Sequence, residues 1–155
     1  MKSLFKKLFL VFTLTLVVTL NLSAQSIYAE LGGPGIASFN IDARFTKNSG
    51  GLGGRIGVGG FKIEDVGVVF VPLGVNYLFS KDNKNFFEVG LGVTPTFGGD
   101  GSSSGMFSTT FGHGIFGYRI EPPDGGLTFR IFLCPIFRKE FFIPYYGGLS
   151  MGYKI

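Results

Sequence analysis

Apolar and polar side chains alternate along most of this chain, and this period of two is the feature that most limits its fold. The clearest stretch covers residues 36–47, where Phe39 and Ile41 alternate with Asn40 and Asp42. Beyond the N-terminal segment, no part of the chain shows the i, i+3, i+4, i+7 spacing of an amphipathic helix. Successive side chains of a β-strand point to opposite faces, so the pattern predicts strands with one apolar and one polar face.

Clusters of Gly, Asn, Asp, Ser and Pro divide this pattern into eight predicted strands. The connections are short, so strands that are neighbours in sequence should pair antiparallel, as an up-and-down meander. A chain of 155 residues forms one domain of this kind. The predicted strands cover residues 26–33, 36–47, 52–61, 66–79, 86–97, 106–120, 127–137 and 143–155.

Three prolines lie inside these predicted strands. Pro72, Pro95 and Pro135 lack the N–H group that a strand ladder needs. We therefore expect bulges or strand ends at these three positions.

The predicted strand over residues 106–120 contains a conflict of phase. Phe107 and Phe111 set one apolar phase, whereas Phe116 and Tyr118 set the opposite one. A β-bulge at His113, which lies between two glycines, would reconcile the two halves.

Side-chain volume indicates which face of the sheet is outside. An eight-stranded barrel has an interior that side chains just fill, and the large apolar residues here would crowd it. Glycines on the opposite face, such as Gly90, Gly92 and Gly152, fit a narrow lumen. Strands of about 9–11 tilted residues also span a bilayer. The sequence thus predicts an all-β fold, an eight-stranded antiparallel up-and-down transmembrane β-barrel. A soluble lipocalin-like barrel with its apolar face inside is the alternative.

The predicted outer face meets lipid. An interfacial girdle would rest on phenylalanines and on the tyrosines Tyr28, Tyr77, Tyr118, Tyr145 and Tyr153, since tryptophan is absent. The residues predicted to face lipid are Phe39, Ile41, Phe45, Phe87, Leu91, Phe129, Leu149 and Tyr153.

The N-terminal segment has the three parts of a secretory signal peptide: a basic start, an apolar run over residues 8–20, and small residues ending near Ala24. We predict that residues 1–24 form a signal peptide that is cleaved and that residues 25–155 form the barrel. A single transmembrane anchor is the alternative, but a spanning helix needs about 20 apolar residues. Export of a barrel of this kind predicts an outer-membrane location.

The polar face brings acids and bases into one lumen. The bland interpretation is a structural interior in which each charge is paired, because an unpaired buried ion is costly. The sharper hypothesis is a ligand or ion site that favours an anion, since bases outnumber acids. The predicted lumen network consists of Glu30, Asp42, Arg44, Arg55, Glu88, Arg119, Arg130 and Lys154.

Candidates for chemistry are few. His113 is the only histidine, and a hydrolase or acyltransferase would have to combine it with Ser108 or Ser150 and an acid such as Asp42. Cys134 is the only cysteine, which excludes an internal disulfide and indicates a small buried residue. We expect no catalytic residues, no metal and no cofactor. Three lysines of the N-terminal segment account for most of the net charge of +4, so nucleic-acid binding is not indicated.

Several motifs resemble those of the small outer-membrane β-barrel proteins of Bacteroidetes, many of them of unknown function. The resemblance covers nearly all of residues 26–155 and implies export, a barrel fold and insertion into the outer membrane. The motifs are SIYAELGGPG, FNIDARF, Gly117-Tyr118-Arg119 with Pro122, GGLTFR with Pro135, and the closing PYYGGLSMGY.

Together these features predict a non-enzymatic outer-membrane barrel with a lumen plugged by side chains and a structural or interaction role in the cell envelope. Its expected partners are membrane lipids and, during assembly, the outer-membrane insertion machinery, and we expect a monomer. Two alternatives stay open. One is a soluble periplasmic lipocalin-like barrel that binds an apolar ligand, and the other is a barrel-embedded lipid-modifying enzyme that uses His113.

Overall fold

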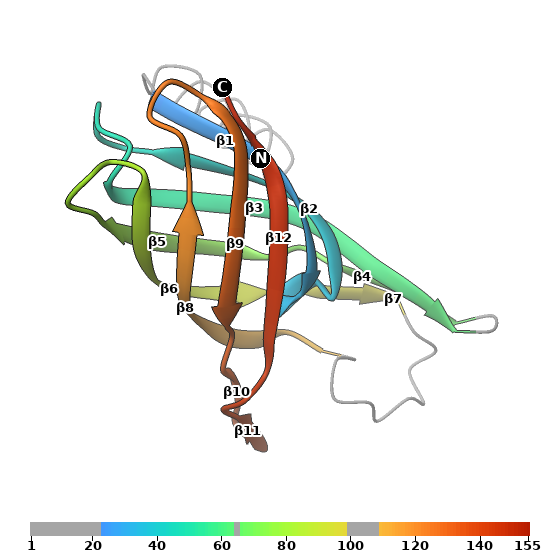
Figure 1. Ribbon diagram of the computed structural model, residues 1–155. Coiled ribbons are helices and arrows are strands. Elements are labelled where there is room, and N and C mark those ends of the chain that lie inside the picture. The colour runs from blue at the N-terminus through green and yellow to red at the C-terminus, as the bar shows by residue number, and fades with distance from the viewer. Residues whose placement is uncertain (1–22, 64–65, 99–108) are drawn as a thin grey trace, which may run out of the picture.

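The computed structural model describes residues 23–63, 66–98 and 109–155, whose strands close into one antiparallel β-barrel (Figure 1). The predicted signal peptide lies outside the described residues except for Ser23 and Ala24, where β1 begins. The elements are β1 (Ser23–Gly32), η1 (Gly33–Gly35), β2 (Ala37–Arg44), β3 (Gly51–Ile63), β4 (Val66–Phe70), β5 (Leu73–Phe79), β6 (Asn85–Thr94), β7 (Thr96–Gly98), β8 (Phe111–Ile120), β9 (Gly126–Leu133), β10 (Ile136–Arg138), β11 (Phe141–Ile143) and β12 (Gly147–Lys154).

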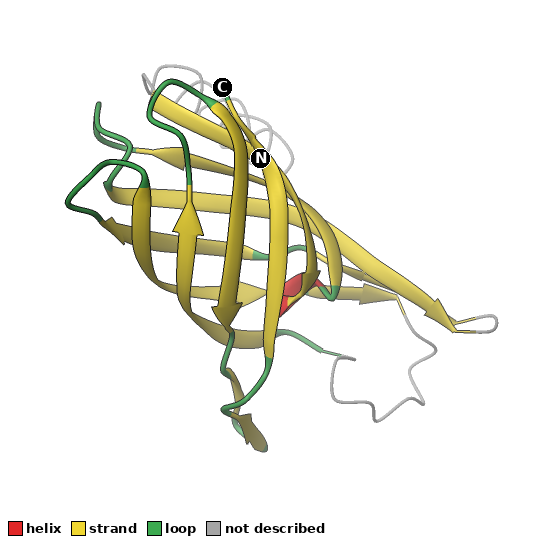
Figure 2. Ribbon diagram, in the orientation of Figure 1, coloured by secondary structure: helices red, strands yellow, loops and turns green. Residues whose placement is uncertain are grey.

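The barrel closes where its first and last strands meet. β1 pairs antiparallel with β2 on one side and with β12 on the other, and β9 joins β12 to β8. The start of β1 and the end of β12 lie side by side at one end of the barrel (Figure 1), where Ile155 N donates to Gln25 O at 2.8 Å. Almost all of the described chain is strand (Figure 2), and none of its helices is long and apolar enough to cross a membrane.

The predicted strand ends at the prolines are confirmed. β4 ends before Pro72, β6 before Pro95 and β9 before Pro135. The register nevertheless continues across each break, because the proline carbonyl still accepts a ladder hydrogen bond: Gly57 N donates to Pro72 O at 2.9 Å, and Gly114 N donates to Pro135 O at 2.8 Å. The short segments β4 and β5, β6 and β7, and β9 and β10 therefore act as three long strands, and the barrel has the eight strands predicted.

The bulge predicted at His113 is wrong. β8 pairs with β6 without a register shift, from Phe111 opposite Thr94 to Ile120 opposite Asn85. The prediction failed because it assumed that every phenylalanine faces outward. Phe111 points into the barrel, in phase with His113, and is only 2% exposed.

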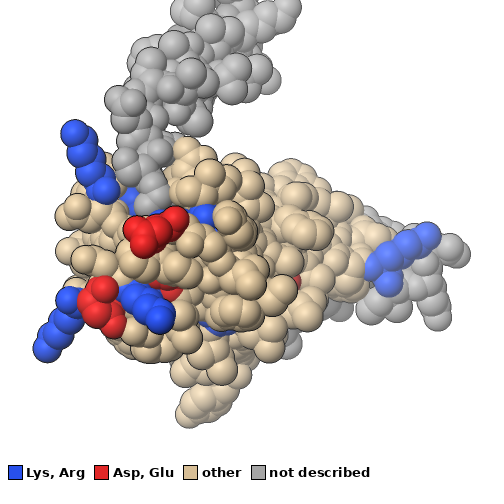
Figure 3. Space-filling view, turned by 45° about the horizontal axis from the view of Figure 1, so that its top comes forward, with Lys and Arg blue, Asp and Glu red and all other residues tan. Residues whose placement is uncertain are grey.

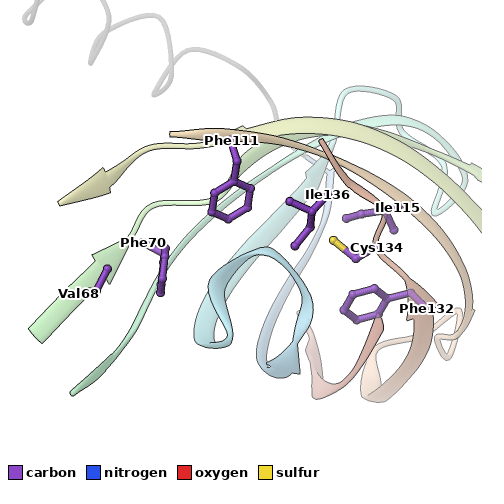
Figure 4. Packing of buried hydrophobic residues seen from close by; sticks show 7 residues of the cluster. All are labelled: Val68, Phe70, Phe111, Ile115, Phe132, Cys134 and Ile136. Carbon is purple, nitrogen blue, oxygen red and sulfur yellow. The ribbon is translucent and has the colours of Figure 1, made fainter. Parts of the chain in front are cut away.

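At the end of the barrel away from the start of β1 and the end of β12, the interior is an apolar cluster rather than the polar lumen expected. Its rings pack closely: the centroids of Phe70 and Phe111 are 6.3 Å apart, and those of Phe61 and Phe70 are 5.8 Å apart. Burial of each such ring stabilises the fold by about 1.5–3 kcal/mol. Figure 4 shows the seven buried members, Val68, Phe70, Phe111, Ile115, Phe132, Cys134 and Ile136.

A buried turn lies beside this cluster. Gly32 and Gly33 have positive φ angles of 77° and 67°, which glycine adopts without strain, and they lead into the 3-10 turn η1. All three η1 residues are buried, so the connection between β1 and β2 folds against the barrel interior instead of extending into solvent.

The opposite end of the barrel carries a tight polar turn between β5 and β6. The Asp82 carboxylate accepts hydrogen bonds from Asn85 Nδ2 at 2.6 Å, from Asn85 N at 2.8 Å and from Lys84 N at 3.0 Å. These hydrogen bonds, with the one from the Asn85 side chain contributing most, hold the pKa of Asp82 below its usual range. The solvent-exposed, charged Asp82 carboxylate thus stabilises the turn by accepting these hydrogen bonds.

Some positions on the lumen face require glycine because a larger side chain from the neighbouring strand lies across them. Gly152 lies opposite Tyr28 in the ladder, and a Cβ at this position would overlap the Ile27 carbonyl oxygen and the Tyr28 side chain. We expect Gly152→Ala to lower the free energy of unfolding by about 1–3 kcal/mol, as overpacking does. Urea titration of the folded protein in detergent micelles measures this change.

Gly67→Ala is the matched control, because no atom lies within 4 Å of a Cβ at Gly67. It should leave the unfolding midpoint close to that of the unchanged protein. Equal losses in the two variants would contradict the steric explanation.

Candidate functional site

The candidate site is the charged interior of the barrel. The structure places all eight residues of the predicted lumen network inside, each at most 4% exposed. They come from seven strands: β1, β2, β3, β6, β8, β9 and β12. Alternation within each strand aims them at one axis, so residues far apart in sequence meet.

Glu88 and Glu30 hold the centre of this network. Glu88 accepts hydrogen bonds from Arg119 Nη2 at 3.0 Å and from Arg130 Nη1 at 3.1 Å. Glu30 accepts a hydrogen bond from Arg55 Nη2 at 3.0 Å and a second, short one from Arg130 Nη2. Arg130 therefore bridges the two glutamates, and each glutamate neutralises parts of two guanidinium groups.

Asp42 forms a second centre, together with an asparagine that the sequence analysis missed. Asp42 pairs with Arg44 at short range and with Arg119 Nη2 at 3.3 Å. Asn76 Nδ2 donates to Asp42 Oδ2 at 2.6 Å and to Glu88 Oε1 at 2.8 Å, so its amide links the two carboxylates. The alternation of β5 places Asn76 inside, between the outward Val75 and Tyr77, but Asn76 was not included in the predicted lumen network.

A third group closes the end of the barrel where β1 starts and β12 ends. Lys154 Nζ donates to Ser49 Oγ at 2.6 Å and to the carbonyl oxygens of Pro122 and Pro123 at 3.2 Å, and it pairs with Glu121 Oε1 at 3.4 Å. Glu121 was missed because it follows a predicted strand and was counted with the turn. Lys154 thus ties the last strand to two turns across the mouth of the lumen.

The prediction that Tyr28 belongs to the interfacial girdle is wrong. Tyr28 is 4% exposed and lies inside the barrel, where the guanidinium carbons of Arg130 and Arg55 lie 4.6 Å and 5.7 Å from the centre of its ring. The alternation of β1 places it on the same face as Glu30, so phase decides its position rather than its residue type. The other tyrosines of the predicted girdle, Tyr77, Tyr118, Tyr145 and Tyr153, are on the outer surface.

The outer wall is apolar. All eight residues predicted to face lipid lie on it and are 47–70% exposed, with Phe39 the most exposed of them. On the face seen in Figure 3, charged side chains gather toward the ends of the barrel, and the wall between them is formed by uncharged residues. The polarity of the molecule is therefore inverted relative to a soluble domain.

A groove of about 870 Å³ lies at the surface beside the turn between β5 and β6. Tyr77, Phe87 and Tyr118 line it beside the turn that contains Lys81 and Asp82. The Tyr118 hydroxyl donates to Asn85 Oδ1 at 2.8 Å. The groove thus joins aromatic wall residues to a polar turn.

The residues proposed for catalysis are not brought together. The hydrogen-bond partner of the His113 ring is Thr94 Oγ1, 3.1 Å from Nδ1, whereas Ser150 Oγ accepts from Arg130 Nε at 3.2 Å. Asp42 is held by arginines, and Ser108 lies outside the described residues. Cys134 is fully buried in the apolar cluster. Within the described ranges, no group of three or more His, Cys, Asp or Glu residues could hold a metal ion.

Comparison with known proteins shows similarity at the level of fold. The N-terminal β-barrel domain of Pseudomonas aeruginosa OprF superposes with a TM-score of 0.59 at 12% identity, over 85% of this chain and 96% of that domain. The Yersinia pestis outer membrane protein Ail, determined in a phospholipid bilayer nanodisc, gives 0.56 at 15% identity, over 86% and 99% of the two chains. The outer membrane enzyme PagL gives 0.48 at 17% identity, over 84% and 98%.

The likeness is one of fold. It supports the closed eight-stranded antiparallel barrel and assigns no activity to this chain. No protein-family model matches the sequence, and no curated protein matches it.

Removal of one lumen carboxylate tests the energetic role of the network. In Glu88→Ala, Arg119, Arg130 and Asn76 lose an acceptor inside the barrel, and an uncompensated buried charge costs about 3–5 kcal/mol. We expect the free energy of unfolding in detergent micelles to fall by that amount.

Glu140→Ala is the control, because its pair with Arg138 is at the surface, with side chains 60% and 30% exposed. Its effect should stay within about 0.5 kcal/mol. A Glu88→Ala protein as stable as this control would show that the lumen charges do not hold the barrel together.

Proposed function

We propose that this protein is a small outer-membrane β-barrel with a structural or interaction role in the cell envelope and no catalytic activity. One observation carries the proposal: large apolar side chains cover the outer wall while a network of charged side chains is buried inside. Contact of such an apolar wall with lipid chains is favourable, whereas its contact with water is unfavourable.

The dimensions support a membrane-spanning barrel. β6 and β8 have ten residues each, within the range of about 9–11 that a tilted strand needs to cross the hydrocarbon layer. Two structures that share the fold, OprF and Ail, are described as a β-barrel domain and an outer membrane protein, which supports the same location. Assignment to the small Bacteroidetes barrels rests on the sequence motifs alone.

The lumen argues against a diffusion pore and against both alternatives. The ionic network fills the middle of the barrel, Lys154 and Glu121 close one end, and the apolar cluster fills the other. A lipocalin-like protein needs an apolar cavity, whereas this interior is occupied by paired charges and by a packed apolar cluster. An enzyme built on His113 needs access for its substrate, and His113 is fully buried.

We further propose that the protein acts as a monomer and meets its partners at its surface. The groove beside Tyr77 and Tyr118 is a candidate place for lipid contact, since aromatic residues are favoured at membrane interfaces. Contact with the insertion machinery would be limited to assembly.

Cell fractionation tests the location. The protein should be recovered in the outer-membrane fraction, and unheated samples should migrate differently from heated ones in gel electrophoresis, as a folded barrel does. Recovery in the soluble periplasm would overturn the proposal and favour the lipocalin-like alternative. Lipid turnover that is lost in His113→Ala would favour the enzyme.

A charge on the outer wall should oppose insertion. Ile41 lies on the wall in the middle of β2, opposite Ile27 and Ile56 in the ladder. We expect Ile41→Arg to reduce the stability of the folded state in phosphatidylcholine vesicles by about 2–4 kcal/mol, the cost of an arginine near the bilayer midplane. Urea titration followed by the gel shift measures it.

Tyr145→Arg is the matched control, because Tyr145 lies in the turn before β12 and is 90% exposed. Its cost should be about 0–1 kcal/mol, as for a residue at the interface. Equal stability of the two variants in vesicles would contradict insertion of the wall into lipid.

A further inference from the structure

Two grooves on the barrel surface meet at one pair of aromatic rings. The first, of about 870 Å³, lies beside the turn between β5 and β6, and the second, of about 490 Å³, lies on the wall across β6, β8, β9 and β12. Phe87 and Tyr118 line both grooves and are direct partners in the ladder between β6 and β8. The two therefore form one continuous groove that leads from the end of the barrel along its wall.

The part of the groove on the wall is apolar. It lies between two parallel rows of outward side chains, the ladder partners Tyr118 and Ile131 in one row and Phe116 and Leu133 in the other. Gly117 lies between the rows and leaves only backbone at the floor. Among the described residues, none that lines this part is acidic or basic. It can receive a hydrocarbon chain and offers no partner to a charged group.

The part of the groove beside the turn carries positive charge. Lys81 lines it, and the Lys81 ammonium group forms no hydrogen bond or ion pair with another described residue. Lys47 and Lys84 lie in the two turns that border the groove, residues 45–50 and 80–84, whose only acid is Asp82. The Asp82 carboxylate is already bound by Asn85 and by backbone amides of its own turn. This end of the groove therefore attracts an anionic group.

Aromatic side chains mark the boundary between the two parts. The ring of Tyr118 lies on the wall, while its hydroxyl donates to Asn85 Oδ1 in the turn at 2.8 Å. The rings of Tyr77 and Phe79, with centroids 4.5 Å apart, line the groove at the same end of the barrel. Rings of this kind are favoured where lipid headgroups meet lipid chains. A charged group at the turn would thus have a chain directed along the wall.

We propose that this groove binds one anionic phospholipid, with its phosphate beside Lys81 and an acyl chain along Phe116, Ile131 and Leu133. The proposal rests on the proposed function, because only a barrel inserted in a membrane presents this wall to lipid. Free phosphate would leave the apolar part of the groove empty, and a hydrocarbon chain alone would leave Lys81 without a partner. The bound lipid belongs to the leaflet at the end of the barrel where β1 starts and β12 ends.

Photo-crosslinking in vesicles locates the lipid. The folded protein is inserted into phosphatidylcholine vesicles that contain a small fraction of phosphatidylglycerol with a diazirine on its acyl chain. Cross-links should concentrate at Ile131 and Leu133 rather than at Ile41 and Ile56 on the opposite wall. Even labelling around the wall would overturn the site and leave the membrane barrel intact. Failure to insert, seen as loss of the gel shift, would overturn the proposed function and the site with it.

Removal of one lysine tests the charged end of the groove. Lys81→Ala should weaken binding of phosphatidylglycerol, measured by native mass spectrometry from micelles, about fivefold, the contribution of one lysine beside an anionic lipid. Lys139→Ala is the matched control, because Lys139 is an exposed lysine in the turn between β10 and β11, at the other end of the barrel. It should keep the affinity. Equal losses in the two variants would refute the site.

A larger side chain tests the apolar part. Ile131→Trp places a ring in the groove and should weaken binding of phosphatidylglycerol about fourfold for each chain methylene that it displaces. Ile56→Trp is the matched control, because it makes the same change on the opposite wall, where Ile56 is 53% exposed. It should leave binding unchanged. An affinity of Ile131→Trp equal to that of the control would refute the chain contact.

Discussion

The structure depends on one constraint: charges placed inside a narrow barrel must pair with one another. An ion removed from water costs several kcal/mol, and the cost is recovered only through close partners with good geometry. Glu88 meets this requirement with Arg119, Arg130 and Asn76, all within hydrogen-bond distance. The outer wall is apolar, so these charges cannot be placed on it and must pair inside. The network and the wall are therefore two consequences of the same inverted polarity.

The period of two predicted eight of the nine acidic and basic side chains that are buried in the described part of the barrel. Strand geometry sends alternate side chains to opposite faces, so phase alone placed Glu30, Arg55 and Arg130 in the lumen. The errors arose where residue type was given more weight than phase. Tyr28 and Phe111 are aromatic yet lie inside, one beneath two guanidinium groups and the other in the apolar cluster. Which acid meets which base could not be predicted, because the pairing depends on strand tilt and side-chain reach.

The prolines illustrate how much of a ladder can be lost without loss of register. Proline removes one donor and keeps its carbonyl, so Pro72, Pro95 and Pro135 each interrupt a strand and still accept a hydrogen bond from the neighbouring strand. The sequence predicted the breaks because the missing N–H is a property of the residue. The preserved register is a property of the closed barrel, in which the flanking pairs hold both halves of the strand in place.

The sequence separation of the lumen pairs links the network to closure of the barrel. Arg130 and Glu30 are 100 residues apart, and Arg119 and Asp42 are 77 residues apart. Each pair joins an early strand to a late one, so neither charge can find its partner until the strands between them have been arranged. Long-range contacts of this kind are made late in folding, after the cost of chain closure. Before the barrel closes, these charges therefore lack their partners. Their pairing stabilises the closed state, in which β12 is paired with β1.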